Sequence, residues 1–529
     1  MKKKEILSRS HRAHSQHAAA LIKLRKIVSG IIFIGFVLLF LGGEKLSVFL
    51  ADLLPPFQLM PALIRSITQP AALFFAGLMF IILITVIFGR VYCSFLCPLG
   101  TLQDIVIALA RRISRKPAYA FSKPQNILRY TILALTFAAI FTGILWLVNL
   151  LDPYSLTGRI FSYFFHPLLV WIYNLGILML KPLNIFLYPK QTAPIPLPDM
   201  AIAAFFLLTI LYLSIKYGRL YCNTLCPVGA FLGLLSHVSI FRLALSEESC
   251  SECLCCESDC KAGCINPKTA SIDMSRCIGC FNCLDACSTT AINYRPVWRR
   301  TRSSSWSPAR RGFIFGSFAA AVALLSAFHR DIRNVAGIIL ANSDPPVTPP
   351  GSLNAEHFSK TCTACCLCVA ACPTSVLTPS FLDYGPAGLL QPKMNYEKSY
   401  CDYECNVCGK VCPTGAITRI ALDDKKLTQI GEAKLLKDVC VVYVEHNNCG
   451  ACGEVCPTHA IRFTDRENIL YPEIDKQYCI GCGACQLACP TTPRSIVVHP
   501  HPVHKKAEKY ITPKPTADSK KLSGKDFPF

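Results

Sequence analysis

Cysteine spacing constrains this chain more than any other feature of its sequence. The chain carries 31 cysteines, and most of them stand two or three residues apart in groups of four. The run formed by Cys479, Cys482, Cys485, Cys489 and Pro490 has the pattern C-x2-C-x2-C-x3-C-P. Three cysteines at this spacing wrap one 4Fe-4S cube, and the fourth turns away to ligate a neighbouring cube. Because the cysteines are clustered, we interpret them as iron ligands rather than disulfide partners.

Six such groups predict six 4Fe-4S clusters, two in an inner module and four in an outer module. The inner groups are Cys250, Cys253, Cys256 and Cys260, and Cys277, Cys280, Cys283 and Cys287. The outer groups are Cys362, Cys365, Cys368 and Cys372; Cys401, Cys405, Cys408 and Cys412; Cys440, Cys449, Cys452 and Cys456; and Cys479, Cys482, Cys485 and Cys489.

The fourth cysteine of each group is expected to serve a different cube from the first three. By the two-cluster ferredoxin rule, Cys287 completes the first inner cube and Cys260 the second. Lys261 and Ser288 replace the proline that usually follows these cysteines. In the outer module, the sequence leaves open which groups exchange fourth ligands. Structural zinc is the alternative for the two irregular middle groups, although zinc favours two separated C-x2-C pairs.

Three further cysteines lie close to these groups. Cys264 occupies a place that alanine takes in the related segment after Cys412, so it is either a small buried residue or a substitute ligand. Cys255 and Cys366 lie inside loops between ligands, and we interpret both as bystanders.

Apolar stretches predict a membrane domain in the first part of the chain. Stretches at residues 27–43, 70–89, 127–150 and 200–217 approach the roughly 20 residues that cross a bilayer core. A fifth and shorter stretch lies at 312–328. The stretch at 160–180 is ambiguous because proline and Arg159 interrupt it, and it could lie in the membrane interface. It is left uncounted, because a full span here would put Cys93 and Cys222 on opposite sides of the membrane. The net charge is +21, and basic residues gather beside these stretches, which favours cytoplasmic loops over nucleic-acid binding.

A repeat inside the membrane domain carries four more cysteines. Residues 88–100 recur as residues 217–229, and each copy contains a C-x3-C-P motif at the end of an apolar stretch. The pairs are Cys93 with Cys97 and Cys222 with Cys226. Each pair lies on one helix face if the helix continues that far, and the proline can open the next helix. The pairs could bind a metal or small cluster, act as a dithiol relay, or be buried structural thiols.

The predicted fold class is an α-helical membrane domain with four spans and a fifth anchoring span, joined to α+β modules of the bacterial-ferredoxin type. We expect a polytopic domain at 1–245, a cytoplasmic module at 246–295, a transmembrane anchor at 296–342, a periplasmic module at 343–500 and a disordered tail at 501–529. Arg310 and Arg311, just before the fifth apolar stretch, are similar to a twin-arginine export signal. No haem-attachment, dinucleotide or P-loop motif is present.

With its C-x3-C-P motifs and cluster groups, the chain resembles a family of membrane electron carriers. Residues 1–295 resemble the membrane subunit of the quinol dehydrogenases that serve periplasmic nitrate reductase. Residues 310–500 resemble the periplasmic iron–sulfur partner of that system, so the chain is similar to a fusion of the two. The membrane part also resembles nitrous-oxide-reductase regulators and copper-oxidase assembly ferredoxins.

The resemblance implies an electron carrier of the bacterial inner membrane that takes electrons from quinol and passes them to a periplasmic redox protein or reductase. The alternative is a factor that donates electrons during assembly or regulation of a metalloenzyme. The residues that take part in the quinol step are unknown, and Asp152, Arg159 and His166 are weak candidates.

Overall fold

The computed structural model describes residues 2–69, 71–114, 119–181, 184, 187–296 and 345–510, which divide into two compact units. Unit 1 contains the described residues of Met1–Asn395 and Asn406–Ile420, and unit 2 those of Tyr396–Cys405 and Ala421–Phe529. The predicted fifth span and the twin arginines lie outside the described residues.

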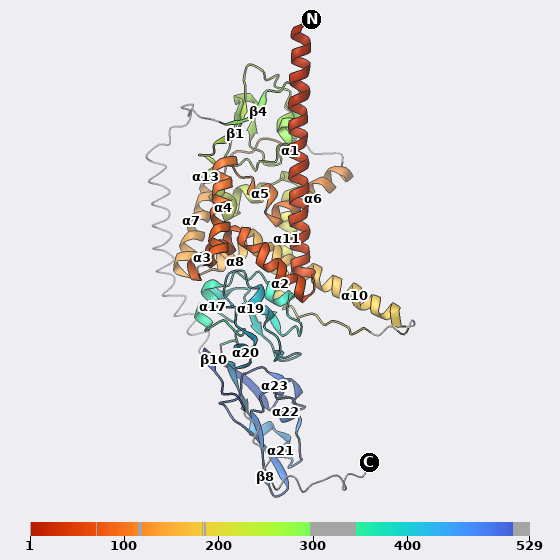
Figure 1. The fold of residues 1–529 in the computed structure, drawn as a ribbon, viewed down its shortest axis with the longest axis vertical. Helices are drawn as coiled ribbons and strands as arrows, with labels where there is room; N and C mark the ends of the chain where they lie inside the picture. The colour runs from red at the N-terminus through yellow and green to blue at the C-terminus, as the bar shows by residue number, and fades with distance from the viewer. Residues whose placement is uncertain are drawn as a thin grey trace. The chain divides into compact units, whose positions relative to one another are not determined.

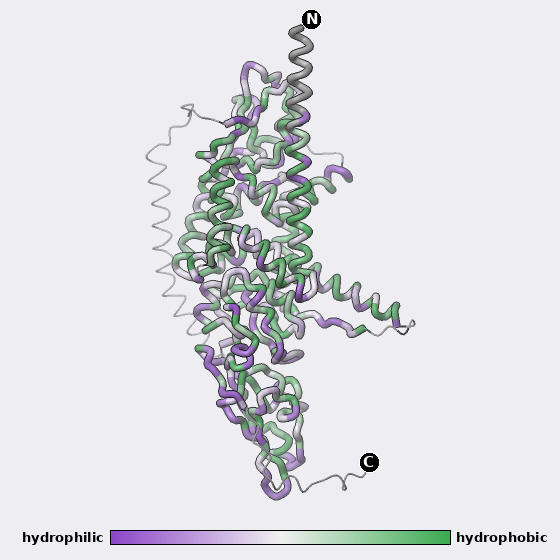
Figure 2. The backbone as a smooth tube through the Cα atoms, viewed as in Figure 1, coloured by the Kyte–Doolittle hydropathy of each residue, from purple (hydrophilic) through white to green (hydrophobic). Residues whose placement is uncertain are grey.

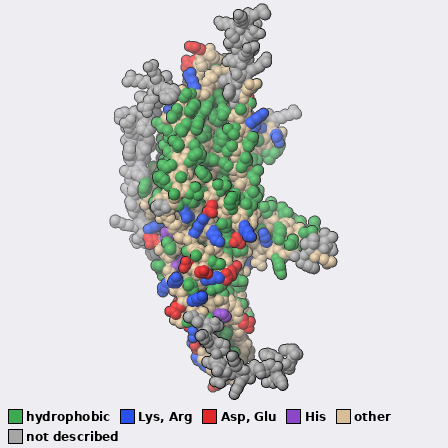
Figure 3. Space-filling view, viewed as in Figure 1, with side chains coloured by type: hydrophobic (Ala, Val, Ile, Leu, Met, Phe, Trp, Pro, Cys, Tyr) green, Lys and Arg blue, Asp and Glu red, His purple; other side chains and the backbone are tan. Residues whose placement is uncertain are grey.

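Four helices of unit 1 correspond to the four predicted spans. They are α1 (Lys2–Leu41), α4 (Ala72–Phe88), α7 (Asn126–Thr142) and α11 (Leu197–Tyr217). Their outward surface is apolar over a broad band (Figures 2 and 3). Within the described part, three helices are long and apolar enough to cross a membrane: Ala18–Leu41, Pro153–Leu180 and Leu197–Tyr217. The helices α4 and α7 are shorter, at 17 residues each, so the number of spans stays a prediction.

Shorter helices connect these four at one end of the bundle. Helix α2 (Glu44–Leu53) continues into the short helix η1 (Pro55–Phe57), and α3 (Leu59–Thr68) follows. The chain bends by 91° between the segment of α2 and η1 and the segment of α3. Helices α8 (Trp146–Leu151) and α9 (Pro153–Ile160) lead through a π-helical turn at Phe161–Phe165 into α10 (His166–Leu180). Figure 1 shows α10 leaving the bundle sideways, and its large apolar side chains, such as Trp171 and Met179, are exposed. The stretch at 160–180 thus belongs to a helix that is apolar enough to cross a membrane, but α10 projects away from the other helices of the bundle (Figure 1).

The two copies of the repeat fold alike. Helix α4 ends at Gly89 and α11 ends at Gly218, and both glycines have positive φ angles, of 81° and 70°, which glycine adopts without strain. The short helices α5 (Tyr92–Phe95) and α12 (Leu220–Thr224) follow, and then α6 (Pro98–Ser114) and α13 (Pro227–Ser236). The prolines open the next helix, as predicted. The helix does not continue to the second cysteine of either pair, because Cys97 and Cys226 lie in the break.

The inner module packs directly on the bundle and shares its hydrophobic core. Its strand β1 (Phe241–Leu245) pairs antiparallel with β4 (Ile292–Pro296), and β2 (Ile265–Asn266) pairs with β3 (Ser271–Ile272). Two one-turn helices, α14 (Cys255–Ser258) and α15 (Asn282–Ala286), carry cysteines. Figure 1 shows β1 and β4 at the end of the bundle opposite α2 and α3.

The predicted outer module is divided between the two units. Unit 1 holds α17 (Ala355–Thr361), α18 (Leu367–Ala370), the paired strands β5 (Leu377–Pro379) and β6 (Pro392–Met394), and α19 (Val407–Val411). Their side of unit 1 is the end of the bundle that carries α2 and α3 (Figure 1).

Unit 2 is built on two antiparallel strand pairs. Strand β7 (Thr428–Leu435) pairs with β10 (Ile496–Lys506), and β8 (Ile461–Arg466) pairs with β9 (Ile469–Ile474). Short helices α20 (Leu422–Lys426), α21 (Val441–Val444), α22 (Ala451–Glu454) and α23 (Ala484–Ala488) complete it. The predicted disordered tail from residue 501 therefore needs correction, because β10 continues to Lys506, which pairs with Thr428.

Candidate metal centres

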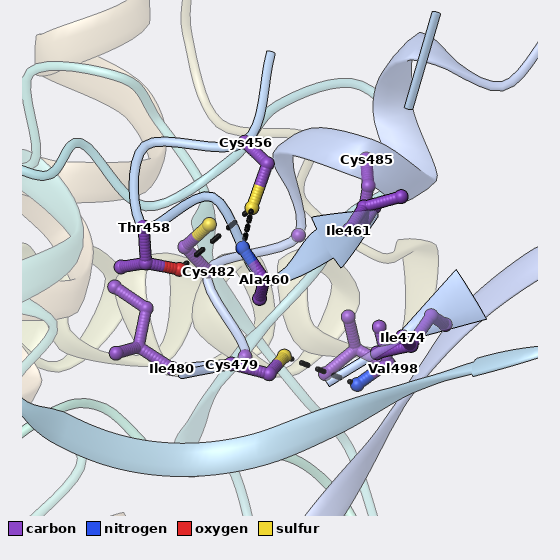
Figure 4. A pocket seen from close by; sticks show the side chains of 13 residues that line it. Cys456, Thr458, Ala460, Ile461, Ile474, Cys479, Ile480, Cys482, Cys485 and Val498 are labelled. Carbon is purple, nitrogen blue, oxygen red and sulfur yellow. Dashed lines mark hydrogen bonds between the residues drawn. The ribbon is translucent and has the colours of Figure 1, made fainter. Parts of the chain in front are cut away.

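Two cysteine-lined cavities in unit 2 show how its groups exchange their last cysteine. One cavity is lined by Cys479, Cys482 and Cys485 together with Cys456 of the preceding group (Figure 4). The other is lined by Cys440, Cys449 and Cys452 together with Cys489. The last cysteine of the third outer group therefore lines the cavity of the fourth, and the last cysteine of the fourth lines that of the third, a pairing that the sequence left open.

Unit 1 contains two cavities of the same kind. Cys362, Cys365 and Cys368 line one cavity with Cys412, which belongs to the second outer group. Cys277, Cys280 and Cys283 line the other with Cys260, the arrangement that the two-cluster rule predicts. In all four cavities the first three cysteines of one group meet the last cysteine of another.

The remaining predicted ligands are less completely defined. The thiol of Cys256 interacts electrostatically with those of Cys287, Cys253 and Cys250, and burial, followed by these thiols, raises its pKa to about 11. The four cysteines predicted to hold the first inner cube, Cys250, Cys253, Cys256 and Cys287, therefore lie near one another. Cys372, Cys401, Cys405 and Cys408 are distributed over both units, so their role stays a prediction.

The donor atoms of the cavities fit a 4Fe-4S cube. Each cavity is lined by four or five cysteines among mainly aliphatic side chains, and backbone N–H groups donate to several sulfurs. Ala433 N donates to Cys479 Sγ at 3.4 Å, Ala460 N to Cys456 Sγ at 3.3 Å and Ile417 N to Cys412 Sγ at 3.4 Å. Such bonds help to set the potential of a cluster. Among the described residues, no three His, Cys, Asp or Glu side chains are grouped closely enough to hold a single metal ion.

The three additional cysteines lie in different environments. Cys264 lines the inner cavity, and its Sγ lies 3.6 Å from Cys260 Sγ. Cys366 also lines a cavity, that of Cys362, Cys365 and Cys368, but its Sγ lies 3.3 Å from the hydroxyl of Tyr163 and not beside a predicted ligand. Cys255 is exposed. Cys264 is therefore the extra thiol that is best placed to act on a centre.

The two C-x3-C-P motifs meet inside the bundle. Cys93, Cys97, Cys222 and Cys226 are all buried and interact electrostatically with one another. Arg90 Nη2 donates to Cys222 O at 3.1 Å, and Arg219 Nη1 donates to Cys93 O at 2.6 Å. Each copy of the repeat thus fixes the cysteine segment of the other. Sequence reasoning missed these arginines, although their place within the repeat was a signal that could have found them.

Asp152 and Arg159, two of the weak candidates for the quinol step, lie together beside the cavity of Cys362, Cys365, Cys368 and Cys412. We call this cavity the first outer cavity. Both are buried, and Asp152 Oδ2 accepts from Ser155 N and Ser155 Oγ at 2.8 Å. Asp152 Oδ1 and the hydroxyl of the buried Tyr154 have no hydrogen-bond partner in the described structure. Burial, only partly offset by the bonds from Ser155, raises the pKa of Asp152 to about 6. His166 begins α10 and joins neither residue.

Comparisons with known proteins identify iron–sulfur domains in both parts of the chain. A family model described as a 4Fe-4S binding domain matches residues 70–117 and 199–245, and each match contains one copy of the repeat. A model described as a 4Fe-4S dicluster domain matches residues 447–492. No solved structure matches this chain.

Curated relatives match different parts of the chain. Ferredoxin-type protein NapH of Escherichia coli is 25% identical over 271 residues, which cover 49% of this chain and 81% of NapH. Ferredoxin-type protein NapF of the same organism is 29% identical over 147 residues, covering 28% of this chain and 81% of NapF. The putative electron transport protein YccM, also from Escherichia coli, is 24% identical over 39% of this chain, which spans only 51% of YccM.

Proposed function

We propose, from the premise that this chain belongs to the Nap-like family of ferredoxin-type polyferredoxins, that it takes electrons from membrane quinol and delivers them to a periplasmic redox protein. The inner module would lie on the cytoplasmic side and the outer groups on the periplasmic side. The basic residues near the apolar helices support this orientation.

The observation that carries the proposal is the contact between the first outer cavity and the bundle. Ser162 Oγ donates to Cys366 O at 3.1 Å, and Arg65 Nη1 donates to Cys412 O at 3.1 Å. Asn149 Nδ2 donates to Leu389 O at 3.0 Å. Side chains of the apolar bundle thus hold the backbone on both sides of this cavity.

The bundle also holds the inner cavity at its opposite end. Ser94 Oγ donates to Gly279 O at 3.3 Å, and Arg90 Nη1 donates to Ser275 O at 2.8 Å. Bound 4Fe-4S clusters would supply one-electron transfer at these sites. A bundle with such a site at each end suits a carrier that works across a membrane.

Oxidation of a quinol also releases protons, so an acceptor is needed near the outer cavity. Asp152 offers a carboxylate oxygen without a partner, and its side chain interacts electrostatically with Cys365 of that cavity. The buried phenol of Tyr154 interacts with Asp152 and with Cys365. We therefore assign Asp152 as the proton acceptor of the quinol step, with Tyr154 as the nearest polar group to position the quinol.

The test is direct reduction by quinol. Anaerobically purified full-length protein, reconstituted in liposomes, is mixed with a reduced menaquinol or ubiquinol analogue, and the visible absorbance of the clusters is followed. Bleaching at a rate that depends on quinol concentration is expected. Full reduction by dithionite without any response to quinol would contradict the proposal and favour an assembly or regulatory role.

A further inference from the structure

The cavity of Cys440, Cys449, Cys452 and Cys489 in unit 2 has the most exposed cysteines of the three outer cavities, and we call it the exposed outer cavity. Cys449, Cys452 and Cys489 are partly exposed, and only Cys440 is buried. In the cavity of Figure 4, by contrast, Cys456 alone is partly exposed. All the cysteines that line the first outer cavity are buried. A centre bound in the exposed outer cavity would therefore lie nearest to solvent.

The exposed outer cavity adjoins the cavity of Figure 4. Each of the two is lined by the last cysteine of the other's group, and the thiol of Cys485 interacts electrostatically with that of Cys452. Electron transfer slows steeply as the distance between two centres grows. Centres bound in these neighbouring cavities could therefore pass an electron from the more buried site to the more exposed one.

Exposed apolar side chains lie around the exposed outer cavity. Leu436, Val444 and Leu470 are 44–56% exposed, and each stands within two residues of a side chain that lines the cavity. Helix α21, which ends at Val444, packs against η6 (Lys437–Val439) and against β9. Leu470 N donates to Asn448 Oδ1 at 2.8 Å, which joins β9 to the loop before the second cysteine of the group. Exposed apolar groups gathered in this way mark interaction sites.

Carboxylates without cation partners belong to the same segments. From Leu436 to the end of β9 at Ile474, the chain has six acidic and three basic side chains, although its net charge is +21. Asp438, Glu445 and Glu454 are exposed, and the ion pairs of the described part of unit 2 leave all three out. Each of the three stands within four residues of a cysteine of the cavity.

The three basic side chains of this segment are already engaged. Lys437 Nζ lies 5.3 Å from the centroid of an aromatic ring. Arg466 pairs with Glu473 at 2.8 Å, and Arg462 pairs with Asp475 at 2.9 Å. They therefore do not neutralise the three carboxylates, and the surface combines exposed apolar groups with excess negative charge.

We propose that the surface around the exposed outer cavity docks a soluble redox protein whose cofactor edge is apolar and ringed by lysine or arginine side chains. The proposal rests on the proposed function, to which it adds the exit site and the chemistry of the partner. One electron leaves the centre in this cavity, which is oxidised, and reduces the cofactor of the partner; no bond changes and no proton moves. Redox encounters of this kind bury less than about 1,200 Å², so a few apolar side chains suffice, and opposite charges speed association.

The first test measures binding without electron transfer. Zinc-substituted cytochrome c, a basic and redox-inactive probe, is titrated with the full chain purified in detergent without oxygen, and the fluorescence of the probe is followed. Binding should weaken about tenfold as the ionic strength rises from about 0.01 to 0.15 M, because salt screens exposed charges. An acidic plastocyanin should not compete with the probe. Competition by plastocyanin, or binding that is independent of ionic strength, would overturn the proposal.

Charge-reversal variants locate the surface. Glu445→Lys/Glu454→Lys should weaken binding of the zinc probe by about tenfold or more at low salt. The matched control is Asp423→Lys/Asp424→Lys, which makes the same change in charge at exposed positions of α20, and it should bind like the unmodified chain. Helices α20 and α21 lie well apart in unit 2 (Figure 1). Unchanged iron content confirms that both variants fold, and equal dissociation constants for the two would overturn the proposal.

Val444→Ser tests the apolar part of the surface. It should weaken binding of the zinc probe about threefold, as the loss of one partly exposed apolar contact would. The weakening should be the same at low and high salt, because an apolar contact is not screened. Unchanged binding in Val444→Ser would contradict an apolar contact at this position.

Electron transfer itself is followed with native cytochrome c and the full chain reduced by dithionite. At low salt, Glu445→Lys/Glu454→Lys should lower the second-order rate constant about tenfold, and the control at α20 should not. Equal rate constants for the two double variants would mean that electrons leave elsewhere. No quinol is present, so failure of the quinol reaction would not change these outcomes, and their failure would leave the reduction of the clusters by quinol intact.

Discussion

Arg219 donates a hydrogen bond of 2.6 Å to the carbonyl oxygen of Cys93, a residue that lies in the other copy of the repeat. Arg90 makes the corresponding bond to Cys222 O at 3.1 Å. Each guanidinium passes close to a glycine, Gly100 for Arg219 and Gly229 for Arg90. The second glycine of each repeated segment is therefore required because a side chain there would occupy the space of the arginine.

Gly229→Ala should destabilise the membrane domain. A Cβ at this position would lie 2.2 Å from Cys222 O and 2.7 Å from Arg90 Nη2, and overpacking of this kind typically costs about 1–3 kcal/mol. Gly176→Ala in α10 is the control, because nothing lies within 4 Å of its Cβ position. Thermal unfolding in detergent should shift downward for Gly229→Ala only. Equal midpoints for the two variants would contradict the close approach.

Asp104→Asn should destabilise the protein by about 3–5 kcal/mol, because it leaves buried cations unpaired. Burial alone would raise the pKa of Asp104, but Arg219, Lys261 and Arg25 outweigh it and hold that pKa well below its usual range. The lowered pKa stabilises the fold above the unfolded-state pKa, and this contribution disappears only as the pH falls toward the folded-state value.

The difference between Asp104→Asn and the unmodified protein should therefore stay constant from about pH 6 to 9. Glu356→Gln, which breaks an exposed pair with Lys360, should cost less than about 1 kcal/mol. Denaturation midpoints at several pH values measure both effects. A penalty that varies across this range would indicate that another group dominates.

Exchange of last cysteines between neighbouring groups predicts which variants lose the same centre. Cys456→Ala and Cys482→Ala should remove one identical paramagnetic signal and about four irons, because both residues line one cavity. Cys489→Ala should remove a different signal, since Cys489 lines the cavity of Cys440, Cys449 and Cys452. If Cys489→Ala and Cys482→Ala abolish the same signal, the exchange is absent.

Cys264 should replace Cys260 as a ligand when Cys260 is removed. Its Sγ lies 3.6 Å from Cys260 Sγ and lines the same cavity. Cys260→Ala should therefore retain its cube with a shifted potential, whereas Cys260→Ala/Cys264→Ala should lose about four irons. Iron analysis of both variants beside Cys264→Ala, which should keep all iron, decides the matter. Equal loss in the single and double variants would leave Cys264 a packing residue.

Asp152→Asn should slow reduction by quinol by about 10²-fold or more, as removal of a general base does, and leave reduction by dithionite unchanged. Because burial raises the pKa of Asp152 to about 6, its carboxylate form increases as the pH rises through that value. The rate in the unmodified protein should rise with pH around 6, and the rate in Asp152→Asn should not. Stopped-flow absorbance measures both; matching pH profiles would remove Asp152 from the quinol step.

The sequence predicted the cysteine groups and the repeat well, because ligand spacing and helix-opening prolines are local properties. Cys260 lines the cavity of Cys277, Cys280 and Cys283, as the two-cluster rule predicts, and Pro98 and Pro227 open helices as expected. The partner of Cys456 could not be predicted, because it depends on a contact with residues that follow more than twenty positions later. The break before Cys97 and the burial of Asp152 are likewise set by packing.

The contact of Ser162 with Cys366 O and of Arg65 with Cys412 O has a kinetic consequence. Two carriers made as separate polypeptides must find each other by diffusion, and their encounter rate depends on how much of each the cell makes. Here one chain supplies both surfaces, so their association becomes an intramolecular event with a high effective concentration. Under the proposed function, throughput at this junction should be independent of protein abundance and insensitive to ionic strength, unlike exchange with any detached partner.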